Sequence, residues 1–340
     1  MKTISFVIPC YNSSSYMDNC INHLVSIGDD IEILIIDDGS DKDDTLQKAL
    51  AWQEKHPDII RAIHKENGGH GSAINTGLSL ATGLYFKVVD SDDYIKDTEF
   101  AEIADYAREQ VKSDDPIDLI IYNYVYDKPS ENAQNPMRYT DMLPTDKVFS
   151  WNDLKNVGYL DYITMHSVMF KTQLLKDCGL QLPEHCFYVD NIFVYYPLVH
   201  AKTIRYFNKD IYMYFIGRDD QSVNENVFKQ RIDQQIRITK IMFDAIDLQH
   251  EVPYRKLRIY MRHYLSMMTA ICAVFLYMIN TEESIQKNKD LWAYFKEQNP
   301  GFARYLKSDL LNRVVLLPGR VGRAFVVFAY RVVHEFFHFN

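Results

Sequence analysis

Three aspartates within the four residues Asp90–Asp93 form the strongest chemical feature of this sequence. They directly follow Tyr85–Val89, an apolar run typical of a buried strand, so their carboxylates come at a strand end. Carboxylates held this close repel one another. A hard divalent cation, Mn²⁺ or Mg²⁺, relieves that repulsion, because it prefers oxygen ligands that it shares with a phosphate. The alternative is an Asp-rich turn that caps the following helix.

Other polar segments follow neighbouring apolar runs at the corresponding point. Tyr11-Asn12 comes after the first run, and Asp37-Asp38 after the second. An acid after the second strand suits a ribose hydroxyl or a base N–H. The glycine-rich segment Asn67–Ser72 leads into a helical pattern, where glycines and a helix N-terminus favour a diphosphate. Each segment is also acceptable as an ordinary turn, with Ser72 as a helix N-cap.

Short apolar runs alternate with helical patterns over the first 125 residues. We expect strands at 4–8, 32–36, 59–63, 85–89 and 118–122, and helices at 16–26, 45–55, 72–81 and 99–110. This alternation indicates a parallel sheet covered on both faces, with ligands bound beyond the carboxyl ends of its strands. Residues 126–150 contain three prolines and predict a loop or a β-hairpin. From Asn224 the pattern is mostly helical, with long helices expected at 227–247, 254–279 and 284–298.

Several classes of protein are excluded. A dinucleotide-binding oxidoreductase needs G-x-G-x-x-G after the first strand, but that position reads Pro9–Ser14, without a glycine. A P-loop is absent, and so is the Gly-rich basic loop that a nucleotidyltransferase would carry after strand one. A net charge of −9 argues against a nucleic-acid partner, which requires a basic surface.

The motifs resemble, in order and spacing, the family 2 glycosyltransferases of GT-A fold. The segments that carry this match are Phe6–Asn12, Ile35–Ser40, Glu66–Gly69, Asn75–Leu78, Ala81–Gly83 and Val89–Asp93. A weaker extension includes Tyr188–Asn191 and Gly217-Arg218. The resemblance implies an α/β fold, with a Rossmann-like, mainly parallel sheet flanked by helices and a mostly helical C-terminal region. It also implies inverting transfer of a sugar from a nucleotide-sugar donor, with UDP as the expected nucleotide.

The resemblance implies a role for each matching residue. Asp92 is expected to hold the Mn²⁺ or Mg²⁺ together with Asp90, and Asp38 is preferred to Asp37 as the nucleoside contact. Asp190 takes the place of the general base, which removes the proton of an acceptor hydroxyl. The full set of expected donor-binding residues is Pro9, Tyr11, Asn12, Asp37, Asp38, Asn67, Gly68, His70, Asn75, Asp90, Ser91 and Arg218.

The acceptor is expected to be a glycan or a lipid-linked molecule of cell-surface polysaccharide synthesis. We expect His166, Gln221 and Ser222 to contact it, against the alternatives of a structural histidine and a surface turn. Residues 1–222 would form the catalytic domain, with a donor-nucleotide half at 1–125 and an acceptor half at 126–222, and 223–340 a helical region. A catalytically inactive scaffold protein of the same fold is the alternative function.

The C-terminal region differs from the acidic body in charge. Its last forty residues set Asp309 and Glu335 against six basic residues, Arg304, Lys307, Arg313, Arg320, Arg323 and Arg331. Mixed with Leu, Val and Phe, these suit an amphipathic helix on an anionic membrane. The alternative is a helix packed on the body.

The remaining sequence features bear on location and assembly. The apolar segment 264–279 is shorter than the roughly 20 residues that span a bilayer, which predicts a buried helix or a homodimer contact. Five cysteines without C-x-x-C spacing predict neither a disulfide framework nor a zinc site. We expect a cytoplasmic protein, peripheral on the inner face of the cell membrane, because cysteine usage fits a reducing compartment and the N-terminus shows no signal peptide.

Overall fold

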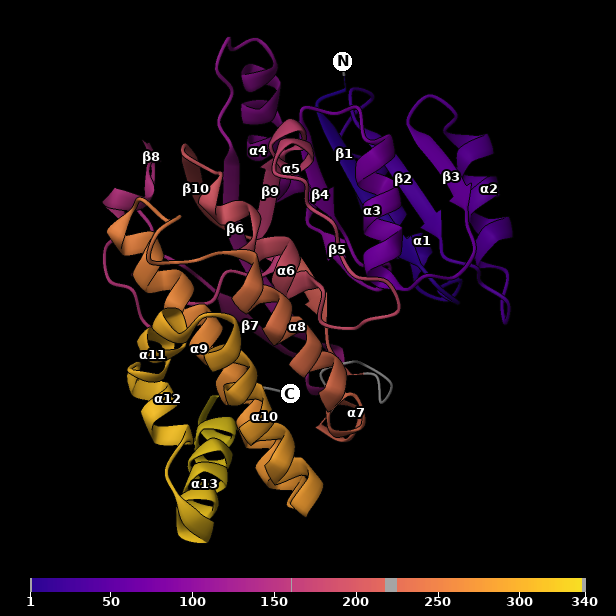
Figure 1. Cartoon of the computed structure of the whole chain (residues 1–340). Coiled ribbons are helices and arrows are strands. Elements are labelled where there is room, and N and C mark those ends of the chain that lie inside the picture. The colour runs from indigo at the N-terminus through magenta and orange to yellow at the C-terminus, as the bar shows by residue number, and fades with distance from the viewer. Residues whose placement is uncertain (1, 160, 218–224, 338–340) are drawn as a thin grey trace. The chain divides into compact units, whose positions relative to one another are not determined.

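The computed structural model describes residues 2–159, 161–217 and 225–337 (Figure 1). The chain divides into two compact units. The first comprises Met1–Asn156 and Ile163–Gly217, and the second comprises Val157–Tyr162 and Arg218–Asn340. The first unit is a sheet flanked by helices, and the second is built from helices.

The described strands of the first unit form one sheet in the order β3-β2-β1-β4-β9-β6-β10-β5, with β7 paired to β6 and β8 paired to β10. Their bounds are β1 Ile4–Cys10, β2 Glu32–Asp37, β3 Ile60–His64, β4 Tyr85–Val88, β5 Tyr94–Ile95, β6 Leu119–Lys128, β7 Ala133–Met137, β8 Val148–Phe149, β9 Val168–Lys171 and β10 Ile204–Phe215. The five expected strands are therefore confirmed. The antiparallel β6–β7 pair confirms a hairpin within 126–150.

The sheet is mainly parallel, as expected, and it also contains antiparallel strands. Strands β1, β2, β3 and β4 pair in parallel, whereas β9 runs antiparallel to both of its neighbours, β4 and β6. An antiparallel strand begins at the edge where its neighbours end. The residues just before Val168 therefore lie at the same rim as those that follow Val88.

Helices cover both faces of the parallel part. Their bounds are α1 Met17–Val25, α2 Thr45–Lys55, α3 His70–Leu80, α4 Asp97–Val111, α5 Thr172–Asp177 and α6 Asp190–Tyr195. In β1, Phe6 makes a ring contact of 5.9 Å with Phe100 of α4. The next residue, Val7, packs against Gly77 of α3, which lies across β1 and β2 (Figure 1). Successive strand residues point to opposite faces, so burial on both sides requires the continuous apolar run of β1.

The second unit contains α7 Glu225–Gln230, α8 Ile232–Ala245, α9 Arg255–Ile279, α10 Glu282–Gln298, α11 Pro300–Lys307, α12 Leu310–Val315 and α13 Gly319–Phe337. The three expected long helices correspond to α8, α9 and α10. Helix α9 packs against α8, α10, α12 and α13. Within the described residues it alone is long and apolar enough to cross a membrane, but 72% of its apolar window is buried inside the protein. The expectation of a buried helix is confirmed.

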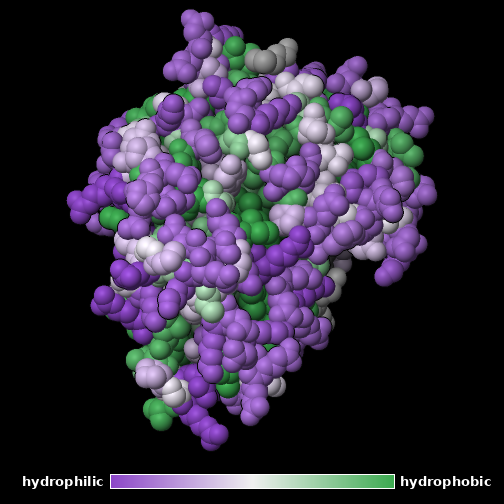
Figure 2. Space-filling view, in the orientation of Figure 1, coloured by the Kyte–Doolittle hydropathy of each residue, from purple (hydrophilic) through white to green (hydrophobic). Residues whose placement is uncertain are grey.

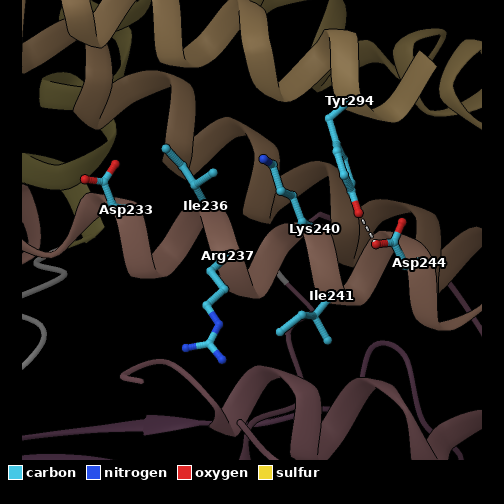
Figure 3. Close-up of a pocket in the computed structure, with 7 residues that line it drawn as sticks. All are labelled: Asp233, Ile236, Arg237, Lys240, Ile241, Asp244 and Tyr294. Atoms are coloured by element: carbon cyan, nitrogen blue, oxygen red, sulfur yellow. Dashed lines mark hydrogen bonds between the residues drawn. The ribbon is translucent and has the colours of Figure 1, made fainter. Parts of the chain in front are cut away.

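Helices α8 and α10 line a pocket of about 290 Å³, shown in Figure 3. Its lining residues are Asp233, Ile236, Arg237, Lys240, Ile241, Asp244 and Tyr294. The hydroxyl of Tyr294 donates a hydrogen bond to Asp244, and the amine of Lys240 lies 4.5 Å from the centroid of the same ring. None of the residues expected to bind donor, metal or acceptor lines this pocket.

All five cysteines are free, and four of them are buried. The expectation that the chain has no disulfide framework is confirmed.

Candidate functional site

Asp90 stands at the centre of the site, directly after β4 and its extension Val89. One carboxylate oxygen, Oδ1, lies 2.8 Å from Nε2 of His70, the first residue of α3. The other, Oδ2, lies 3.6 Å from Nε2 of His166, in the 3₁₀ turn Met165–Ser167 that precedes β9. The rim thus brings together two residues predicted for the donor, Asp90 and His70, and one predicted for the acceptor, His166.

The pKa values of His70 and Asp90 depend on each other's charge. Burial disfavours a charged imidazole at His70, yet the nearby carboxylates of Asp90, Asp190 and Asp92 raise its pKa. Burial likewise disfavours ionised Asp90, yet His70 and His166 hold the pKa of its carboxyl far below its usual range. The pairing therefore favours ionised Asp90 and the protonated form of His70.

Asp93 fixes the turn Asp90–Asp93 through hydrogen bonds to β10. It is fully buried, and its two oxygens accept hydrogen bonds from the Tyr212 hydroxyl at 2.6 Å and the Phe215 amide at 2.8 Å. Burial raises the pKa of Asp93 well above its usual value, and the charges of Asp92 and Asp90 raise it further. Tyr212 also accepts a bond of 3.2 Å from the Asp90 amide. The turn is thereby fixed to β10, a role for Tyr212 that no sequence motif indicated.

A divalent cation fits this group. Among the described residues, Asp90, Asp93 and His166 place one ligand atom each within 4.8 Å of one another. Nδ1 of His166 is buried without a hydrogen-bond partner, and the ring stacks on Tyr214 with 4.3 Å between centroids. Carboxylate oxygens suit Mn²⁺ and Mg²⁺. The three-residue group does not include Asp92, which is partly exposed beside it.

Asp190 begins α6 and is partly buried near the same residues. Burial raises its pKa; the imidazoles of His166 and His70 oppose this, and the charge of Asp90 adds to it. A carboxyl with a raised pKa is better matched to accepting a proton near neutral pH. Two residues earlier, Tyr188 has φ 65, a left-handed conformation that a bulky side chain rarely adopts.

The segment before Asp190 is tied to α3. The side chain of Asn75 donates to the carbonyl of Leu182 at 2.8 Å and accepts from its amide at 3.0 Å. Ser72 donates to Glu184 at 2.7 Å, and the His185 amide donates to the Gly68 carbonyl at 2.6 Å. The amide group of Asn75, predicted to contact the donor, therefore serves here to position the segment that leads to Asp190.

Asp38 is enclosed by the glycine-rich segment. Its Oδ1 accepts from the amine of Lys65 at 2.6 Å and the amide of Gly68 at 3.0 Å. Its Oδ2 accepts from the amide of Gly69 at 2.7 Å and the side chain of Asn67 at 3.1 Å. The amides of Gly68 and Gly69, expected to face a diphosphate, are directed at a carboxylate. In this structure the glycine-rich segment encloses the carboxylate of Asp38.

The other expected donor residues occupy the ends of β1 and β2. Asp37 is fully buried, and its Oδ2 lies 2.6 Å from Nδ1 of His64. The Asn12 side chain accepts hydrogen bonds from the amides of two residues in the loop after β2, and Pro9 is buried within β1. Tyr11, in contrast, is 48% exposed.

Ser91 connects the aspartate turn to the end of β1. Its hydroxyl donates to the hydroxyl of Ser13 at 3.0 Å. Three further expected residues, Arg218, Gln221 and Ser222, lie outside the described residues.

The mainly parallel sheet, with acidic residues at the rim where its strands end, has the GT-A nucleotide-sugar-binding fold. Residues 5–159 match the family described as Glycosyl transferase family 2. The N-terminal part of the chain is therefore similar to the family 2 glycosyltransferases.

Individual proteins agree with this family. GlyG, a glycosyltransferase of Streptococcus pneumoniae, is 36% identical over 126 residues, which cover 36% of this chain and 40% of GlyG. The structure of Staphylococcus aureus TarS 1–349 in complex with UDP-GlcNAc superposes with a TM-score of 0.68 at 18% identity, covering 99% of this chain and 92% of TarS. The mannosyltransferase PcManGT from Pyrobaculum calidifontis, in complex with GDP-Man and Mn²⁺, gives a TM-score of 0.52 at 14% identity, with 96% and 87% covered. The structural likenesses establish the fold.

Proposed function

We propose that this chain transfers a sugar from a UDP-sugar to a hydroxyl of a glycan or lipid-linked acceptor, by metal-assisted inverting single displacement. The observation that carries the proposal is the convergence of Asp90, Asp190, His70 and His166 at one rim of the sheet. The UDP-GlcNAc bound to TarS, whose fold this chain shares, supports a UDP-sugar as donor.

The donor would lie along the rim formed by the ends of β1, β2 and β4. Tyr11 offers an exposed ring on which a base can stack, and the enclosed Asp38 fixes the loop beside it. Asp90 and Asp92 would hold Mn²⁺ or Mg²⁺, with the His166 imidazole beside them. When bound, the metal stabilises the charge on the departing nucleoside diphosphate. The Mn²⁺ in the PcManGT complex supports this assignment.

Asp190 would act as the general base. As the acceptor oxygen bonds to the anomeric carbon, its proton passes to the Asp190 carboxylate and the bond to the nucleoside diphosphate breaks. Burial, which raises the Asp190 pKa, strengthens the carboxylate as a proton acceptor. His70 and His166 lie close enough to oppose this shift electrostatically.

The deciding experiment measures release of UDP from a panel of UDP-sugars, with and without Mn²⁺ and with candidate acceptors. Asp92→Asn should abolish the metal-dependent rate, because it removes one anionic oxygen from the cation site. Full activity of Asp92→Asn would overturn the metal assignment. If no UDP-sugar shifts the melting temperature and none is turned over, the catalytically inactive scaffold becomes the better description.

We further propose that the chain acts in the cytoplasm, at the membrane face where lipid-linked acceptors of cell-surface polysaccharides are built. In this proposal residues 1–222 carry out the transfer, with donor contacts at 1–125 and acceptor contacts at 126–222. The helical region 223–340 supplies the contact with the membrane, and a homodimer contact through the same region is the alternative.

A further inference from the structure

Helix α13 has two apolar faces, and the described residues cover only one of them. The inner face carries Val326, which is buried in a cluster with Ala270, Ala273 and Val274 of α9. The outer face carries large apolar side chains spaced four and three residues apart, which share one side of a helix. These are Val321, Phe325 and Phe328, exposed by 84%, 50% and 63%.

The preceding helix and the link to α13 also carry exposed apolar side chains. Leu310 at the start of α12 is 65% exposed, and Leu317 in the link to α13 is 39% exposed. Figure 2 shows hydrophobic groups at the surface over α12 and α13, among hydrophilic neighbours. We call the exposed set Leu310, Leu317, Val321, Phe325 and Phe328 the outer apolar face.

The charge around this face is predominantly positive. Between Leu310 and Val333 the sequence contains four arginines and no acidic residue, although the whole chain has a net charge of −9. Arg320 and Arg331 are exposed and lie eleven residues apart, about three helical turns, so they project along one edge of α13. Acids near this face are few: Asp309 is fully buried and paired with Arg262 of α9, and Glu335 is the one acidic residue of α13, against Arg320, Arg323 and Arg331. This excess of positive charge favours a negatively charged partner.

We propose that the outer apolar face of α12 and α13 docks on the surface of an anionic lipid bilayer. Phe325, Phe328 and Val321 would enter the boundary between headgroups and acyl chains, while Arg320 and Arg331 bind headgroup phosphates. A second copy of this chain is a poorer partner. A symmetric contact through this face would bring its arginines toward their own copies, with Glu335 as the one acidic residue of α13 against three arginines. The inference is independent of the transfer chemistry, which resides in the other unit.

The test uses the full chain and vesicle co-sedimentation. Phosphatidylcholine vesicles are compared with vesicles that also contain phosphatidylglycerol. The parent should bind the anionic vesicles, and bind the neutral ones about tenfold more weakly or less. The paired change Phe325→Ser with Phe328→Ser, and separately Arg320→Glu with Arg331→Glu, should each reduce binding to anionic vesicles about tenfold or more.

Matched controls come from the first unit. Leu50→Ser changes an apolar side chain that is 48% exposed on α2, and Arg61→Glu reverses an exposed charge on β3. Both should leave vesicle binding unchanged. Equal binding of neutral and anionic vesicles, or full binding by both α13 variants, would overturn the proposal. The proposal would also be overturned if the parent does not bind vesicles but forms a dimer that dissociates into monomers when Phe325 and Phe328 are replaced. The face would then bind a second copy of the chain.

A soluble-substrate assay separates this inference from the proposed transfer. UDP release to water or to a soluble acceptor should be the same in the α13 variants as in the parent. Thermal unfolding of each variant verifies that the helical unit remains folded, because the replaced side chains face outward. Loss of vesicle binding with retained UDP release supports the docking surface alone, whatever the natural acceptor is.

Discussion

The side-chain amine of Lys87 donates a hydrogen bond of 2.6 Å to the main-chain carbonyl of His166. Lys87 lies inside β4 and is completely buried, and it also donates to the carbonyl of Met165 at 2.8 Å. Its amine lies 4.6 Å from the ring centroid of Tyr212, and burial lowers its pKa. One buried lysine therefore fixes the turn that carries the His166 imidazole beside Asp90.

Replacing Lys87 by Met should destabilise the protein and displace His166. The change leaves two buried carbonyls without their donor, at a cost of about 2 kcal/mol or more in the free energy of unfolding. Urea denaturation measures this cost. Lys202→Met, at an exposed position of the same unit, is the control and should change stability little. A Lys87→Met protein as stable as the parent would show that Lys87 does not hold the turn.

The close contact between Gly77 and Val7 leaves no room for a side chain at position 77. A Cβ at Gly77 would clash with the side chain of Val7, in the centre of the α3–β1 packing. Gly77→Ala should therefore lower the free energy of unfolding by about 1–3 kcal/mol, as overpacking does. Gly301→Ala, in α11, meets no atom closer than 3.5 Å and should be neutral or stabilising by up to about 1 kcal/mol. The melting temperatures of the two variants should shift in opposite directions, or the decrease in Gly77→Ala should be clearly larger than any change in Gly301→Ala.

Asp190→Asn tests the general base with little change of shape. Transfer should fall about 10²–10⁴-fold, because an amide cannot take the acceptor proton. Binding of UDP, followed by thermal shift, should persist because Asp190 contributes to the acceptor step. The control is Asp177→Asn, in α5, which lies outside the proposed site. A transfer rate within about threefold of the parent would assign the base to another group.

His263 should make the helical unit sensitive to acid. Burial lowers its pKa, helped by Arg262, although Asp309 opposes the shift, and its ring stacks on Tyr159 at 4.1 Å. Because the folded-state pKa is below the unfolded value of about 6.5, the unfolded chain takes up the proton first. The stability due to neutral His263 is complete above that value and is lost as pH falls through the folded-state pKa.

The measurement is the pH dependence of unfolding in the parent and in His263→Phe, which keeps a stacking ring and does not titrate. The parent should lose more stability than the variant on going from about pH 7 to about pH 5. Parallel pH profiles would contradict the assignment.

The sequence predicted the parallel core well because β1, β2 and β4 are continuous apolar runs that end in polar residues. It did not predict β9, since four residues with one polar end carry no indication of strand direction. The role of Lys87 could not be predicted, because this residue lies within an apolar run that indicates only a buried strand. The motifs placed Asp90, His70 and Asp190 at one rim, but spacing alone could not show that Asn75 would be occupied by the Leu182 main chain. Contacts between segments over a hundred residues apart depend on tertiary packing.

The two ends of β9 lie at opposite edges of the sheet, and only the first end lies at the rim that carries Asp90. Residues immediately upstream of Val168, including His166, lie at the rim beside Asp90, whereas Lys171, at the far end of the same short strand, pairs with Tyr85 at the opposite edge of the sheet. Substitutions in the few residues before the strand should therefore act on the site directly. Length changes after it should act on the site only through the segment that leads to Asp190, which Asn75 and Ser72 hold to α3.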